Sequence, residues 1–119
     1  MKTKYPGDAE RIKHILEAID YIELAIKNHS ELSFINDHTT VNACIYKYSI
    51  IGEATNCLNR NLLAGYLYPW HQVKSFRNFV LHEYHAVKMN VIWNTCVKSL
   101  PELKKVMMKI QSDHFFPIK

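Results

Sequence analysis

The sequence predicts an all-α fold, an antiparallel bundle of four main helices with an additional short C-terminal helix. In several segments, apolar residues recur at the i, i+3, i+4 and i+7 positions of an amphipathic helix. Only 3 glycines and 4 prolines interrupt the 119 residues, and no segment alternates like a half-buried strand. We therefore expect a single domain over residues 1–119, with a core over about 8–111 and a tail over 112–119.

The first helix is predicted over residues 8–27, with Asp8 as its N-cap. Its apolar residues fall within an arc of about 120° on a helical wheel. They are Ile12, Ile15, Leu16, Ile19, Ile22 and Ile26. Ser30 is placed to cap a short turn that carries Leu32 and Phe34.

A second helix is predicted over residues 40–62. One face gathers Val41, Cys44, Ile45, Tyr48, Ile51, Thr55, Leu58 and Leu62. Gly52 lies on the same face, where glycine costs about 1 kcal/mol against alanine, so we expect a close helix neighbour. Gly65 is a predicted helix stop, and Pro69 is a predicted helix start.

The second half of the chain contains three further predicted helices. One covers residues 69–83, and the next begins with Asn90 as its cap and runs to about residue 97. Pro101 is expected to interrupt that helix and to start the short fifth one, 101–111, in its first turn.

Net charge, cysteine content and the lack of long apolar segments restrict the kinds of function to consider. A net charge of +4 mildly favours a polyanionic partner. Cys44, Cys57 and Cys96 are odd in number and widely spaced, which favours reduced, partly buried thiols over disulfides or a zinc site. No window approaches eighteen apolar residues, and residues 1–14 lack the apolar region of a signal peptide. We expect a cytoplasmic protein that does not bind membranes.

The segment RNFVLHEYH, residues 77–85, carries the residues best suited to chemistry. If it is helical, Lys74, Asn78, His82 and His85 fall within roughly 80° of one another. Asn78 can orient His82, four residues later. Arg77 lies about 140° from His82 around the axis, a separation that a two-fold related second copy could close.

Arginine and histidine together suit RNA cleavage. Arginine binds phosphate with a planar fork and stays charged, and histidine titrates near neutrality and can transfer protons. The 2′-hydroxyl of RNA is an internal nucleophile, so in principle one base and one cation suffice without a metal.

The same residues carry a resemblance to a known family. "RNFVLHEY" resembles the R-N-x-x-x-H-x-Y signature of HEPN domains of the HepT type. "ERIKHILEAIDYIE", "YSIIGEATNCL", "PWHQVKSFRNFVLHEY" and "VIWNTCVKSLPELKK" resemble further segments of that family, in the same order. The resemblance covers roughly residues 8–111.

This resemblance implies a HEPN-type helical homodimer with a ribonuclease cleft at its interface, acting on mRNA or tRNA without a cofactor. It implies the toxin of a type VII-like toxin–antitoxin system, whose antitoxin is an MNT-type nucleotidyltransferase that adds AMP to the motif tyrosine. By position, Arg77 and His82 are the catalytic pair, Asn78 is the supporting residue, and Tyr84 is the AMP acceptor.

Family members commonly continue with "FGVD" after the tyrosine, whereas this chain has His85, Ala86, Val87 and Lys88. These residues make the predicted cleft more basic, so His85 and Lys88, with Lys74, are candidate RNA contacts. His82 and His85 have the spacing of a metal pair but no obvious third ligand, and no metal is expected. The alternative function is a non-catalytic HEPN subunit that binds a nucleotidyltransferase partner or a nucleotide.

Overall fold

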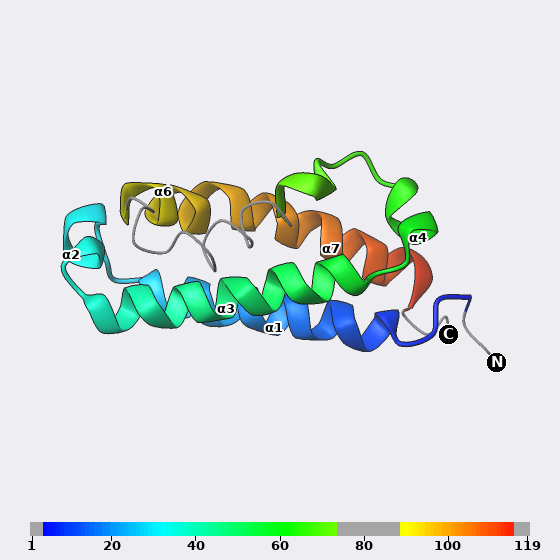
Figure 1. Ribbon diagram of the computed structural model, residues 1–119, viewed down its shortest axis with the longest axis horizontal. Coiled ribbons are helices and arrows are strands. Elements are labelled where there is room, and N and C mark those ends of the chain that lie inside the picture. Colours follow the sequence, from blue (N-terminus) through cyan, green and yellow to red (C-terminus); the bar gives the residue numbers. More distant parts are fainter. Residues whose placement is uncertain (1–3, 74–88, 116–119) are drawn as a thin grey trace.

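The computed structural model describes residues 4–73 and 89–115, and this part of the chain is helical with no strand (Figure 1). The all-α prediction is confirmed. The elements are α1 (Asp8–Ile26), α2 (Glu31–Ile35), α3 (His38–Cys57), α4 (Arg60–Ala64), α6 (Met89–Asn94), the π-helical segment η2 (Thr95–Ser99) and α7 (Leu100–His114).

The long helices lie along one axis of an elongated molecule, 49 × 29 × 21 Å. Figure 1 shows α1 running antiparallel both to α3 and to the stretch from α6 to α7. α2 closes one end of this bundle, and α4 lies at the other end, near both termini. Of the helix predicted over residues 69–83, the structure describes only the beginning, where residues 70–73 are helical.

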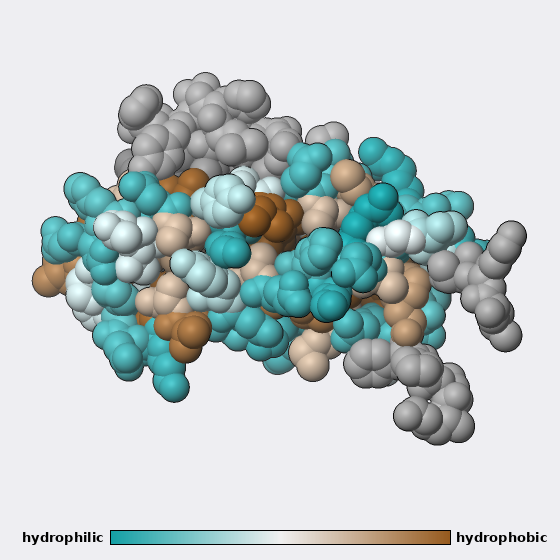
Figure 2. All heavy atoms as spheres, turned by 90° about the horizontal axis from the view of Figure 1, so that it is seen from below, coloured by the Kyte–Doolittle hydropathy of each residue, from teal (hydrophilic) through white to brown (hydrophobic). Residues whose placement is uncertain are grey.

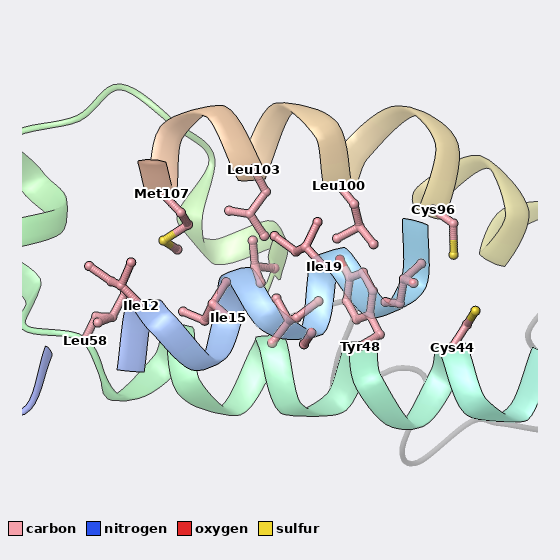
Figure 3. Packing of buried hydrophobic residues seen from close by; sticks show 14 of the residues in the cluster. Ile12, Ile15, Ile19, Cys44, Tyr48, Leu58, Cys96, Leu100, Leu103 and Met107 are labelled. Carbon is pink, nitrogen blue, oxygen red and sulfur yellow. The ribbon is translucent and has the colours of Figure 1, made fainter. Parts of the chain in front are cut away.

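The core lies between α1, α3 and α7, whose apolar side chains point toward one another (Figure 3). Four isoleucines of α1, spaced by three or four residues, are fully buried: Ile12, Ile15, Ile19 and Ile22. Burying an aliphatic side chain of this size stabilises a fold by about 1.5–3 kcal/mol, so this stripe is a main source of stability.

The predicted core faces of α1 and α3 are largely confirmed. On α3, Tyr48, Ile51, Thr55 and the glycine between them, Gly52, are all buried, as are most other members of the predicted face. Leu16, Ile26 and Ile45 are only partly buried, because they lie at the edges of the two stripes.

Asp8 is not the N-cap that the sequence predicts. Gly7 holds the cap position of α1 with φ 84°, a left-handed conformation that suits glycine, and no side chain caps the helix there. Asp8 begins the helix instead and is 1% exposed. Its carboxylate accepts hydrogen bonds from Arg11 and from the backbone N–H of Asn59, so a tertiary contact replaces the local one.

The predicted short turn after Ser30 is confirmed as α2. The Ser30 hydroxyl accepts from the N–H of Ser33, whose own hydroxyl accepts from the N–H of Ser30, a capping box. Asp37 caps α3, which ends at Cys57 rather than near residue 62. Leu58 is extended with ψ 147°, and Asn59 then caps the separate helix α4 by accepting from the N–H of Asn61.

The C-terminal stretch differs from the prediction of two helices separated at Pro101. Residues 89–114 form one uninterrupted helical run, in which Asn90 lies inside α6 instead of capping it. Within this run the N–H of Leu100 donates to the carbonyl of Thr95, five residues earlier, in a π turn. This wider turn places Pro101 in the first turn of α7, where a missing N–H costs nothing. α7 is therefore not short, since it has 15 residues and extends to His114.

The face in Figure 2 is largely hydrophilic, with hydrophobic residues in separate patches. Exposed hydrophobic side chains on the described helices include Tyr21, Leu24 and Tyr46, and the ammonium of Lys47 lies 4.6 Å from the centre of the Tyr21 ring. None of the helices in the described residues is both long and apolar enough to span a membrane.

Candidate functional site

The residues predicted to carry chemistry lie outside the part of the chain that the structure describes. They are Lys74, Arg77, Asn78, His82, Tyr84, His85 and Lys88. What the structure does describe is the frame on both sides of them, residues up to Val73 and from Met89 onward. This frame determines where the polypeptide enters and leaves the predicted site.

On the N-terminal side, Trp70 fixes the chain to α4. Gly65 ends α4, as the sequence predicts. The indole Nε1 of Trp70 donates to the carbonyl of Leu63 at 3.1 Å and to that of Tyr66 at 3.2 Å. The Leu63 carbonyl also accepts from the backbone N–H of Tyr66, so the indole adds a second hydrogen bond to the end of α4 and one to the residue just beyond it. The predicted helix start at Pro69 is supported by the helical state of residues 70–73.

On the C-terminal side, aromatic and aliphatic packing against α2 holds the chain. Ile92 is buried, and the Trp93 ring lies 5.2 Å from the ring of Phe34, which is fully buried. Trp93 is partly buried and packs against the core, and α2, a helix of only five residues, provides much of the surface against which α6 packs.

A pocket of about 260 Å³ lies where the end of α3, α4 and the first residues after Pro69 meet. Its lining combines polar and apolar side chains: Thr55, Asn56, Leu58, Arg60, Leu63, Trp70 and His71. Arg60, Asn56 and His71 are exposed, whereas Leu58 and Leu63 are buried. Arg60 forms no ion pair with any residue that the structure describes.

A second pocket, of about 240 Å³, lies between α3, residues 68–73 and the stretch from η2 to α7. Its polar lining includes Tyr48, Tyr68, Gln72, Thr95 and Glu102. Burial raises the pKa of Tyr48, and burial together with the nearby Glu102 carboxylate raises that of Tyr68. Both phenols therefore stay protonated near neutral pH and can act as hydrogen-bond donors.

Cys44 of α3 and Cys96 of η2 face each other across the core (Figure 3). Both thiols are free, and the hydrogen bond to Cys44, together with burial, raises the pKa of Cys96. A buried, protonated thiol is a poor nucleophile, so Cys96 acts as a core residue. The prediction of reduced thiols agrees with this arrangement, although Cys57 is exposed rather than partly buried.

Within residues 4–73 and 89–115, no group of three or more His, Cys, Asp or Glu side chains is arranged to hold a metal ion. This finding does not test whether His82 and His85 bind a metal, because both residues are outside the described part.

The comparison with known proteins gives the family. The chain matches the family described as Ribonuclease HepT-like over residues 15–110, which include the whole RNFVLHEYH segment. This chain belongs to the HepT-like ribonuclease family. The resemblance predicted from the sequence motifs is thereby confirmed.

Three relatives show the sequence identity and the coverage with which this HepT-like chain matches known proteins. It is 31% identical to "Putative RNase TTE0752" of Caldanaerobacter subterraneus, over 92% of this chain and 96% of the relative. It is 29% identical to "Probable ribonuclease HepT" of Thermococcus cleftensis, over 84% of this chain and 92% of the relative. A 30% identical protein of Methanocaldococcus jannaschii, "Gamma-glutamylcyclotransferase and putative RNase MJ0434", is longer, and the match spans 86% of this chain and 46% of that protein. No solved structure matches.

Sequence reasoning missed the pocket at the end of α3, because it predicted one helix through residue 62, whereas α3 ends at Cys57 and α4 begins at Arg60. A signal was available, however. His71 is seven residues before Asn78 and eleven before His82, so all three fall within about 40° of one another on a continuous helix. In this HepT-like chain the polar stripe predicted from Lys74 onward therefore begins three residues earlier, at a residue that lines the pocket.

Proposed function

We propose that this HepT-like protein is a metal-independent endoribonuclease toxin that cleaves mRNA or tRNA in a cleft shared by two copies of the chain. The observation that carries the proposal is the family match over residues 15–110, within which the complete R-N-x-x-x-H-x-Y motif stands at residues 77–84. The net charge of +4 is consistent with a polyanionic substrate.

In the proposed reaction, Arg77 binds phosphate and His82 transfers protons. The 2′-hydroxyl loses its proton to a general base, and its oxygen forms a bond to the adjacent phosphorus. The bond from phosphorus to the 5′-oxygen breaks, and that oxygen takes up a proton. His82 serves in proton transfer, and the Arg77 guanidinium binds the phosphate oxygens on which negative charge accumulates. The products are a 2′,3′-cyclic phosphate and a free 5′-hydroxyl.

The homodimer that the family resemblance implies would also bring the two catalytic residues together. On one helix, positions five residues apart point about 140° away from each other. An isologous interface brings the Arg77 of one copy to the His82 of the other, and does so twice. Asn78 lies one helical turn before His82 and orients its imidazole. Lys74, His85 and Lys88 provide positive charge for RNA along the same cleft.

We further propose that an MNT-type nucleotidyltransferase antitoxin silences the toxin by adding AMP to Tyr84. The adenylyl group would carry a phosphate and a base into the cleft, where Arg77 binds phosphate, and would exclude RNA. The intact mass of the chain, co-expressed with such a transferase, tests this. The mass should increase by one adenylyl group, and the increase should be absent in Tyr84→Phe.

The proposed activity is tested with purified protein that is free of any antitoxin. Incubation with RNA in the presence of EDTA should give fragments that end in 2′,3′-cyclic phosphate. His82→Ala should abolish cleavage, because no other group in the proposed mechanism moves the proton. His14→Ala is the matched control, since His14 is exposed on α1 and pairs with Glu10 at the surface.

RNA that stays intact with the wild-type protein would overturn the proposal. In that case the chain would be a non-catalytic subunit that binds a nucleotidyltransferase, and the complex would form equally well with Arg77→Ala and His82→Ala.

A further inference from the structure

The pocket at the end of α3 has the composition of a phosphate site. Arg60 provides a guanidinium fork that forms no ion pair with the described residues, and Asn56 and His71 add an amide and an imidazole. None of the described residues that line it is acidic. Arginine with further hydrogen-bond donors around it favours a phosphate group over a carbohydrate or an apolar ligand.

The other walls of the pocket suit a nucleoside. The Trp70 ring is held in place by its two hydrogen bonds to backbone carbonyls, so it presents a preformed flat surface. Leu58 and Leu63, which also line the pocket, are buried. Unpaired RNA bases are commonly recognised by stacking on aromatic rings, and a rigid ring loses little entropy on binding.

Thr55 adds an unused polar group at this pocket. Its side chain is 4% exposed, and its hydroxyl has no hydrogen-bond partner among the residues that the structure describes. A buried hydroxyl without a partner costs about 1–3 kcal/mol, so such groups are rare unless a ligand or water completes them. Thr55 belongs to the same pocket lining as Arg60 and Trp70.

The pocket is also close along the chain to the predicted catalytic residues. On the helix that the sequence predicts over residues 69–83, His71 would share a face with Asn78 and His82. At 1.5 Å per residue, the eleven positions from His71 to His82 span about 16 Å along a helix. On that predicted helix, a phosphate in the pocket would be too far from His82 to be the scissile one and would belong to a flanking nucleotide of the same RNA strand.

We propose that this pocket is a subsite for an RNA nucleotide that flanks the cleaved bond, with Arg60 and His71 on its phosphate and Trp70 against its base. The proposal rests on the ribonuclease function proposed above. The subsite holds the strand in register and contributes to binding, and it takes no part in the chemical step.

The test compares a short substrate with a long one. A dinucleotide with a single scissile phosphate cannot reach the pocket, whereas an RNA of about ten nucleotides can. In Arg60→Ala, KM for the long RNA should rise roughly tenfold with kcat unchanged, because one charge-assisted phosphate contact is lost. KM for the dinucleotide should not change. Arg60→Lys should recover only part of the affinity, because the point charge replaces the fork.

Lys105→Ala is the matched control, because it also removes one exposed positive charge but lies on α7. If it raises KM as much as Arg60→Ala does, the effect is one of general charge and the subsite is refuted. An equal loss for both substrates in Arg60→Ala also refutes it. Asn56→Ala provides a second variant, with an expected loss in the same direction.

Failure of the proposed function can be told apart from failure of the subsite. Binding of fluorescently labelled RNA is measured by anisotropy, whether or not the RNA is cut. If the wild-type protein binds RNA without cutting it, and Arg60→Ala binds more weakly with a smaller salt dependence, the subsite stands and the ribonuclease proposal falls. If the protein cuts RNA and Arg60→Ala binds it equally well, the ribonuclease stands and the subsite falls.

Discussion

At the scale of single residues, Asp8 shows how a local prediction can identify an important residue and assign it the wrong role. Its carboxylate lies 2.7 Å from Nη1 of Arg11 and 3.0 Å from the backbone nitrogen of Asn59. The second contact joins the start of α1 to the loop between α3 and α4, 51 positions later in the chain. Because Arg60 follows Asn59 directly, Asp8 also supports the backbone on which the proposed RNA subsite is built.

We expect Asp8→Ala to lower the free energy of unfolding by about 2 kcal/mol, because the part-buried N–H of Asn59 and the Arg11 guanidinium lose their charged acceptor. Urea unfolding followed by circular dichroism measures the change. Glu10→Ala is the control, since Glu10 stands in the same first turn but is exposed. Equal losses in the two variants would mean that only the first-turn charge matters, and that the contact with Asn59 does not.

At the scale of elements, caps and a π turn determine where the helices begin and end. Asp37 caps α3 by accepting hydrogen bonds from the N–H and the hydroxyl of Thr40. These hydrogen bonds hold the pKa of Asp37 below its ordinary value, despite some opposing desolvation. A carboxyl whose pKa is lowered on folding stabilises the fold above its ordinary pKa, and this contribution is lost as the pH falls through the lowered value.

The charge on Asp37 should therefore matter at neutral pH and not in acid. Asp37→Asn keeps a good N-cap side chain and removes only the charge. We expect its Tm to lie below that of the wild-type protein at about pH 6, and the difference to shrink as the pH falls toward about 2, because Asp37 takes up a proton as the pH falls through its lowered pKa. Thermal unfolding at both values measures this. Glu31→Gln, in the first turn of α2, serves as the comparison, and a difference that persists in acid would contradict the prediction.

At the scale of the whole molecule, the three described long helical stretches pack into a bundle that fixes both ends of the predicted catalytic segment. Trp70 ties one end to α4, and Ile92 and Trp93 tie the other to the core beside α2. Lys104 of α7 also bridges to Asp20 and Glu23 of α1, at 3.0 and 2.8 Å. Such partly exposed ion pairs contribute little energy, so the buried isoleucine stripe holds this frame together.

If the cleft is shared between two copies, inactive variants should complement each other. Arg77→Ala and His82→Ala should each be inactive alone as homodimers. When the two are unfolded together and refolded, random pairing makes about half the dimers mixed, and each mixed dimer has one complete site. We therefore expect about a quarter of the wild-type cleavage rate. Separately refolded and then mixed proteins are the control, and no recovery in the co-refolded sample would place both residues in one chain's site.

The sequence by itself determined the helical class, the buried faces of α1 and α3, the Ser30 cap, the Gly65 stop and the family. These depend on residues a few positions apart, so periodicity and capping preferences report them directly. Only the tertiary structure decided the role of Asp8, the continuous helix through Pro101 and the pocket formed by Arg60, Trp70 and His71. Each depends on contacts between distant segments or on a balance between helix types, which local spacing does not encode. For the same reason, the motif at residues 77–84 identified the family, while its arrangement in a shared cleft remains the prediction that complementation tests.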